Sequence, residues 1–131
     1  MNLVLKWLQS ALAVILGYAL IVLLTTITFK LTGPVKYDQT SAMTFLLAGI
    51  GVFISGICGG YLAAWIGQRS PFLHATAVLI PLTLDTTFVV TSGISRDPVW
   101  FDLMNAFGLM FATLCGGLAY RLRKRTTLVS D

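Results

Sequence analysis

The sequence contains no glutamate, a single histidine and only two cysteines, and charged residues make up just 11% of its 131 positions. Both cysteines, Cys58 and Cys115, lie inside apolar runs, which fits neither a secreted disulfide framework nor the ligand spacing of a zinc site. No nucleophile–base pair and no glycine-rich phosphate loop is present. We therefore expect no catalytic residues, no enzymatic activity, no metal and no cofactor.

Hydrophobic residues account for 56% of the chain and gather in four long stretches with almost no charge. Each stretch has the roughly 20 residues that an α-helix needs to cross about 30 Å of hydrocarbon. With their connections they use nearly the whole chain. The sequence predicts an all-α integral membrane bundle forming a single domain over residues 1–131, with spans at about residues 7–29, 41–66, 72–92 and 100–120.

The basic residues predict the orientation of the bundle. If the N-terminus is cytoplasmic, six bases fall on the cytoplasmic side and three on the other, which favours cytoplasmic termini in a bacterial inner membrane. Four of the six follow the last span directly: Arg121, Arg123, Lys124 and Arg125. Bases clustered at a membrane helix end typically hold anionic lipid headgroups, so we expect this role and no nucleic-acid binding.

A tripeptide is repeated in the second and fourth spans. Cys58-Gly59-Gly60 recurs as Cys115-Gly116-Gly117. Apolar segments of the first and third spans also match, and they are separated by nearly the same number of residues as the two tripeptides. The repeat suggests two helical hairpins of the same orientation, related by an axis along the membrane normal, as in some transporters. Chance similarity between apolar segments of restricted alphabet is an equal alternative.

Small residues form regular stripes on two spans and predict their packing surfaces. On the second span, Gly49, Gly56, Gly60 and Gly67 are spaced seven, four and seven apart, with a GxxxG pair at the centre. On the fourth span the stripe consists of Gly108, Ala112 and Gly116. Such faces let helix backbones approach closely, within one chain or between chains.

The third span carries an unusual polar stripe. His74, Pro81, Asp85 and Ser92 share one face, and Pro81 removes a backbone hydrogen bond and predicts a kink. Asp85 lies about 10 Å below Ser92 by helical rise. Threonines of the first span reach a similar depth, so we expect a polar cluster in the outer leaflet, approached by Lys30 or Arg96. Its members are Asp85, Asn105, Asp102 and Thr86.

Two interpretations of Asp85 stay open. Carboxylates inside membrane spans are rare and typically belong to proton or cation pathways. The alternative is a hydrogen-bonding group that holds neighbouring helices in register, for which Asp85 alone, without a second embedded charge, is sufficient. A hydrated cavity that reaches Asp85 would favour the first interpretation.

The segment from Gly59 to Ala64, followed by Arg69, Pro71 and His74-Ala75, resembles uncharacterised small bacterial four-span inner-membrane proteins. The resemblance implies the same architecture and membrane but brings no activity and no site residue. The first span lacks the membrane-embedded glutamate that marks small multidrug transporters, and no fluoride-channel signature is present.

Two functional hypotheses follow. The first is a non-enzymatic membrane protein that acts by helix–helix association, as a homo-oligomer or as an accessory or assembly subunit, with the glycine stripes as contact faces. The second is a small proton- or cation-coupled transporter or channel that uses Asp85.

Overall fold

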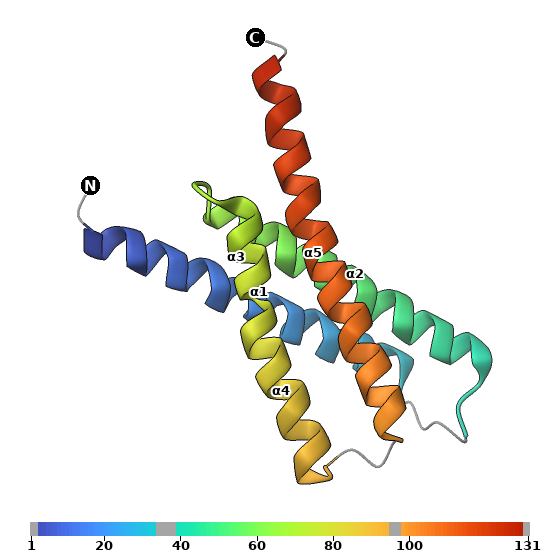
Figure 1. The fold of residues 1–131 in the computed structure, drawn as a ribbon. Coiled ribbons are helices and arrows are strands. Elements are labelled where there is room, and N and C mark those ends of the chain that lie inside the picture. The colour runs from blue at the N-terminus through green and yellow to red at the C-terminus, as the bar shows by residue number, and fades with distance from the viewer. Residues whose placement is uncertain (1–2, 34–38, 95–97, 130–131) are drawn as a thin grey trace.

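The computed structural model of the protein describes residues 3–33, 39–94 and 98–129, and the side chains of the last helix as far as Thr127. Every element in this part is an α-helix (Figure 1): α1 (Leu3–Thr32), α2 (Ala42–Ile66), α3 (Pro71–Ala77), α4 (Leu79–Ser92) and α5 (Val99–Val129). With α3 and α4 taken as one interrupted span, four segments are long and apolar enough to cross a membrane. The predicted all-α, four-span membrane fold is confirmed.

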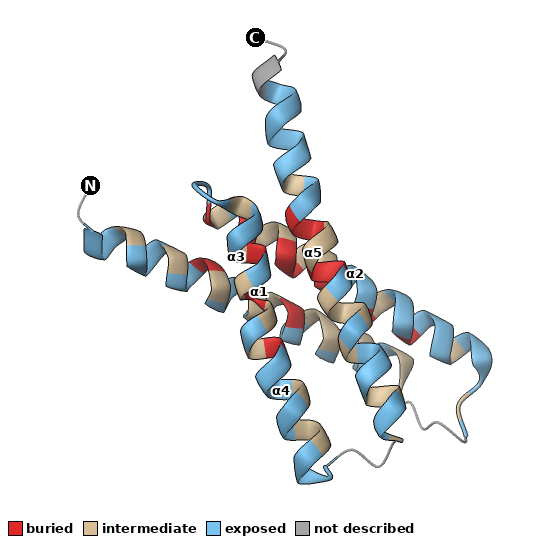
Figure 2. Ribbon diagram, in the orientation of Figure 1, coloured by how far each residue is buried: buried red, intermediate tan, exposed pale blue. Residues whose placement is uncertain are grey.

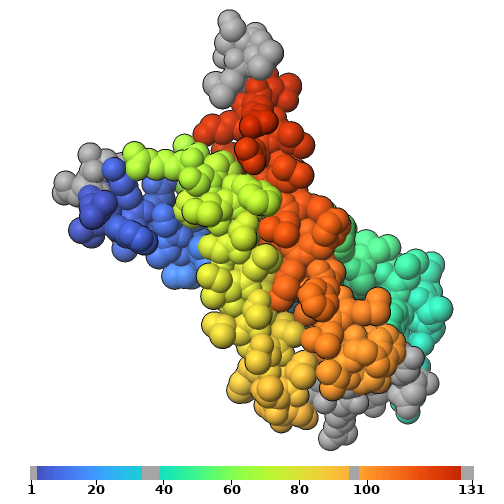
Figure 3. All heavy atoms as spheres, viewed as in Figure 1, coloured from blue at the N-terminus to red at the C-terminus, as the bar shows by residue number. Residues whose placement is uncertain are grey.

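The first and last helices are longer than the predicted spans. The apolar run predicted a last span of about residues 100–120, whereas α5 continues to Val129. Apolar length measures the hydrocarbon crossing and not the helix, and Arg, Lys and Leu are good helix formers. At 31 residues, α5 is about 46 Å long, and its C-terminal part extends beyond the rest of the bundle (Figure 3).

The helices form two antiparallel hairpins that cross one another (Figure 1). One hairpin is α1–α2, the other is α3/α4–α5, and α2 packs against both α1 and α5. Burial is concentrated where the hairpins cross (Figure 2), around a core of Ile21, Ala63, Val78 and Leu82. We call the end of the bundle with the termini and the α2–α3 turn the terminal end, and the opposite end the distal end.

The crossing of α2 and α5 depends on residues without large side chains. Four members of the predicted stripes meet here: Gly56, Gly60, Ala112 and Gly116. A Cβ atom on Gly60 would overlap the Thr113 carbonyl, and one on Gly116 would overlap the Ile57 carbonyl. The two helices run in the same direction, so this is the close backbone contact that GxxxG-type faces make between parallel membrane helices.

The outer members of the two stripes do not take part in the α2–α5 contact. A Cβ atom on Gly49 or Gly108 would meet nothing within 4 Å, so neither residue packs against another described helix of the same chain. Gly67 faces the ring of His74 on α3 and caps the end of α2. Helices that cross at an angle are close only near the crossing point, and residues two turns away diverge.

A second close contact, between α1 and α2, was not predicted. A Cβ atom on Gly17 would lie 2.9 Å from the Gly59 carbonyl oxygen, and one on Gly59 would lie 2.7 Å from the Gly17 carbonyl oxygen. The repeated tripeptide aligns Gly59 with Gly116, but Gly59 contacts α1 whereas Gly116 contacts α2. The aligned glycines therefore do not occupy equivalent places in the packing.

The third span is interrupted, as its proline predicts. α3 ends at Ala77 and α4 begins at Leu79, because Pro81 has no N–H to donate to the Ala77 carbonyl. α3 packs against α1, α2 and α5, whereas α4, apart from its junction with α3, packs extensively only against α5. The distal half of the bundle is therefore more open than the terminal half.

Candidate functional site: an acidic cavity in the distal half

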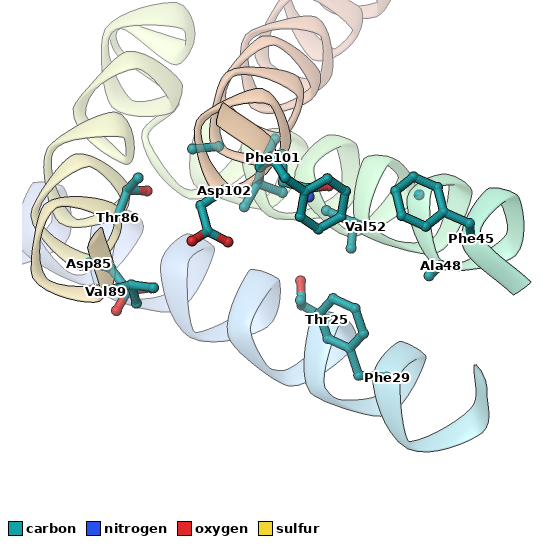
Figure 4. A pocket seen from close by; sticks show the side chains of 14 residues that line it. Thr25, Phe29, Phe45, Ala48, Val52, Asp85, Thr86, Val89, Phe101 and Asp102 are labelled. Atoms are coloured by element: carbon teal, nitrogen blue, oxygen red, sulfur yellow. The ribbon is translucent and has the colours of Figure 1, made fainter. Parts of the chain in front are cut away.

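A cavity of about 480 Å³ opens between α1, α2, α4 and α5, where α4 leaves the other helices (Figure 4). Each of these four helices contributes to its wall. The polar side chains that line it are Thr25, Asp85, Thr86, Asp102 and Asn105. The cavity reaches Asp85, and the proton or cation interpretation of Asp85 is the one that a hydrated cavity at this place would favour.

The four residues predicted as a polar cluster all line this cavity. Asp85 and Thr86 are neighbours on α4, and Asp102 and Asn105 lie three residues apart on the same face of α5. They come together because α4 and α5 are antiparallel neighbours joined at the distal end. Similar depth on adjacent helices was the signal that predicted this grouping.

The two carboxylates have no protein partner in the part of the chain that the structure describes. Asp85 is exposed and Asp102 half-buried, and neither accepts a hydrogen bond or forms an ion pair there. Their polar neighbours bond within their own helices: Thr86 donates to the Leu82 carbonyl over 2.9 Å, and Asn105 donates to the Phe101 carbonyl over 3.2 Å. Among the described residues, Asp85 therefore makes no interhelical hydrogen bond of the kind that the register-holding interpretation expects.

No basic side chain lines the cavity among the described residues. Lys30, expected to approach the cluster, is exposed on α1 and does not line the cavity; Arg96 lies outside the described residues. The described wall is consequently acidic and carries no internal counter-charge.

Thr25 adds a hydrogen-bonding group on the α1 side. Its Oγ1 atom is buried and has no hydrogen-bond partner among the described residues, and the side chain lies at the cavity wall (Figure 4). Other threonines of these helices bond the carbonyl four residues earlier, as Thr28 does with Leu24 over 2.9 Å. A buried, unpaired hydroxyl costs free energy, which sets Thr25 apart from the other threonines of these helices.

Three phenylalanines form a part of the wall that we did not predict: Phe29, Phe45 and Phe101. The rings of Phe45 and Phe101 are 5.1 Å apart between centroids and tilted by 44°. Helical spacing was the signal available, since Phe29 follows Thr25 by four residues and Phe101 immediately precedes Asp102. Aromatic residues near membrane boundaries are so common that this spacing alone did not distinguish them.

The predicted basic cluster lies at the terminal end. Arg123 donates to the Tyr61 hydroxyl over 2.9 Å, and Lys124 donates to the Gln68 carbonyl over 3.1 Å, which ties α5 to the end of α2. Arg121 and Arg125 are exposed and make no hydrogen bond or ion pair with another described residue. These two remain available for the anionic headgroups that the sequence predicts.

Comparisons with known proteins add no assignment: no family model matches the chain, and neither curated proteins nor solved structures give a significant match. The function is therefore argued from the cavity itself.

Proposed function

We propose that this small membrane protein binds cations in the distal cavity and acts as a carrier or channel that moves cations or protons across the membrane. One observation supports the proposal above the others. Two carboxylates, Asp85 and Asp102, line a cavity whose described wall holds no base to neutralise them. Carboxylates at membrane depth are costly, so they need a proton, a cation or water.

The association hypothesis keeps only part of its predicted contact faces, because Gly108 is still open at its Cβ position. Gly56, Gly60 and Gly116 are occupied inside the monomer, and Gly49 lines the cavity. Association with a second copy or with another membrane subunit is still the competing proposal, because α4 leaves much of its surface uncovered. A partner helix seated against α4 would close the cavity instead of using it.

Substitution of Asp85 separates these proposals. Asparagine keeps the shape and the hydrogen-bonding capacity but cannot carry charge or exchange a proton. We expect Asp85→Asn to reduce pH-dependent cation flux in proteoliposomes at least tenfold while the thermal unfolding temperature stays near that of the wild type. Flux is measured with an internal pH dye, and stability by thermal denaturation in the same detergent.

Thr87→Val is the matched control, because Thr87 lies two residues from Asp85 on α4 but does not line the acidic cavity. The control should retain wild-type flux. Equal flux in wild type and Asp85→Asn would refute the cation proposal. Loss of a defined oligomer in Asp85→Leu, with unchanged flux and an intact oligomer in Asp85→Asn, would support association instead.

We further propose that both termini are cytoplasmic, in a bacterial inner membrane. The support is the six-to-three excess of bases on the terminal side. A phosphatase reporter, which is active only in the periplasm, should be inactive when fused to either end, and a cytoplasmic fluorescent reporter should be active at both. Periplasmic activity at either terminus would reverse the topology.

A further inference from the structure

We propose that the cavity takes an amphiphilic organic cation, an ammonium group attached to an apolar or aromatic body. This inference rests on the cation-binding function proposed above and names the class of ligand. Three observations support it: the separation of carboxylates and phenylalanines along the cavity wall, the cavity volume, and the aromatic rings themselves.

The cavity has two chemically different regions (Figure 4). Asp85 and Asp102 lie in the region beside α4, together with Thr86. Phe29 and Phe45 lie toward the distal ends of α1 and α2, and Phe101 lies between the two regions. A ligand that complements this wall carries positive charge at one end and apolar surface at the other.

The size of the cavity argues against a bare metal ion as its only ligand. Hard cations such as Ca²⁺ need about six to eight oxygen ligands at short range. The described residues contain no group of three or more His, Cys, Asp or Glu side chains that could hold a metal ion. A volume of about 480 Å³ instead lies in the range of small organic ligands, roughly 300–1,000 Å³.

The aromatic rings support the same class of ligand. Ammonium groups are attracted to the faces of aromatic rings, and an apolar body gains from burial against them. Charge complementarity therefore selects a cation over an anion, and the phenylalanines select an organic cation over an inorganic one.

Benzyltrimethylammonium is the probe, since it combines a permanent charge with one aromatic ring. Tetramethylammonium has the charge without the ring, and neopentylbenzene has the same shape without the charge. The full chain in nanodiscs of neutral lipid is titrated with each by calorimetry. We expect benzyltrimethylammonium to bind at least tenfold more tightly than either comparison compound. Equal affinity for benzyltrimethylammonium and tetramethylammonium would overturn the inference.

Gly49→Leu tests the location of the site. Gly49 lines the cavity and has open space around its Cβ position, so a leucine fills the cavity without touching a helix contact. We expect a tenfold or greater loss of probe affinity with an unchanged unfolding temperature. Gly108→Leu is the matched control, because Gly108 has equal space but does not line the cavity. If Gly49→Leu is unstable, Val89→Trp fills the cavity from α4.

Unchanged probe affinity in a folded cavity-filling variant would refute the site. The two proposals fail differently. Asp85-dependent flux without preference for the aromatic probe would leave cation handling standing and remove only the amphiphilic ligand. Flux that does not depend on Asp85 would remove the proposed function itself.

Discussion

Gly60→Ala should destabilise the protein by about 1–3 kcal/mol, although alanine is the better helix former by roughly 0.5–1 kcal/mol. The added methyl group would overlap the Thr113 carbonyl, which belongs to the backbone of α5 and cannot rotate away. Helices α2 and α5 must then move apart at the point where their backbones are closest. The free energy of unfolding of the purified protein, measured by denaturant titration in mixed micelles, gives the effect.

Gly49→Ala is the matched control for this prediction. Gly49 lies on the same helix and on the same sequence stripe, but its Cβ position is open. We expect no loss of stability there. The same contrast should appear on α5, where Gly116→Ala would overlap the Ile57 carbonyl and Gly108→Ala would meet nothing. If all four variants were equally stable, the α2–α5 crossing described above would be incorrect.

This contrast also shows where sequence reasoning stops. The sequence spacing places Gly49 and Gly60 on one face of α2, but it gives no information about the angle at which α5 crosses that face. The angle decides that the contact is confined to the centre, and it results from the packing of all the helices together. Gly17 was missed for a related reason, since a lone glycine in an apolar span has no visible partner until the neighbouring helix is in place.

The spans and the polar cluster were more predictable. Hydrophobic length determines how many times the chain crosses the membrane, and helical rise gives the depth of each side chain. Asp85 and Asn105 could therefore be brought together from the sequence. The sequence could not predict whether Asp85 would form a hydrogen bond to a neighbouring helix or face a cavity. That outcome depends on how far α4 diverges from the other helices. The interruption before Pro81 is the local cause of that departure.

The two halves of the bundle differ in both packing and polarity. Glycine and alanine bring the helices together near the crossing, where Ala63, Ala64 and Ala112 are almost fully buried. The distal half lacks such contacts between α4 and the α1–α2 hairpin, and the carboxylates lie in this half. A rigid crossing beside an open acidic cavity is the arrangement on which the proposed cation binding depends.

Leu84→Lys and Asp85→Lys are expected to have opposite outcomes, although the two residues are neighbours on α4 at nearly the same depth. Leu84 is 67% exposed and does not line the acidic cavity, so we expect it to face lipid. A lysine at this position should make the free energy of membrane insertion less favourable by about 2.5–3.5 kcal/mol, and the favourable contribution of the leucine is lost as well. We expect a large decrease in the amount of membrane-inserted protein, measured by fractionation and immunoblotting.

Asp85→Lys instead places an ammonium group in the cavity opposite Asp102, where it supplies the missing counter-charge. Insertion and thermal stability should stay close to those of the wild type, since an intramembrane charge with a partner is tolerated far better than one facing lipid. The tethered cation should also exclude any soluble one and abolish cation flux. If both lysine variants failed to insert equally, Asp85 would face lipid and not a cavity, and the acidic site would have to be abandoned.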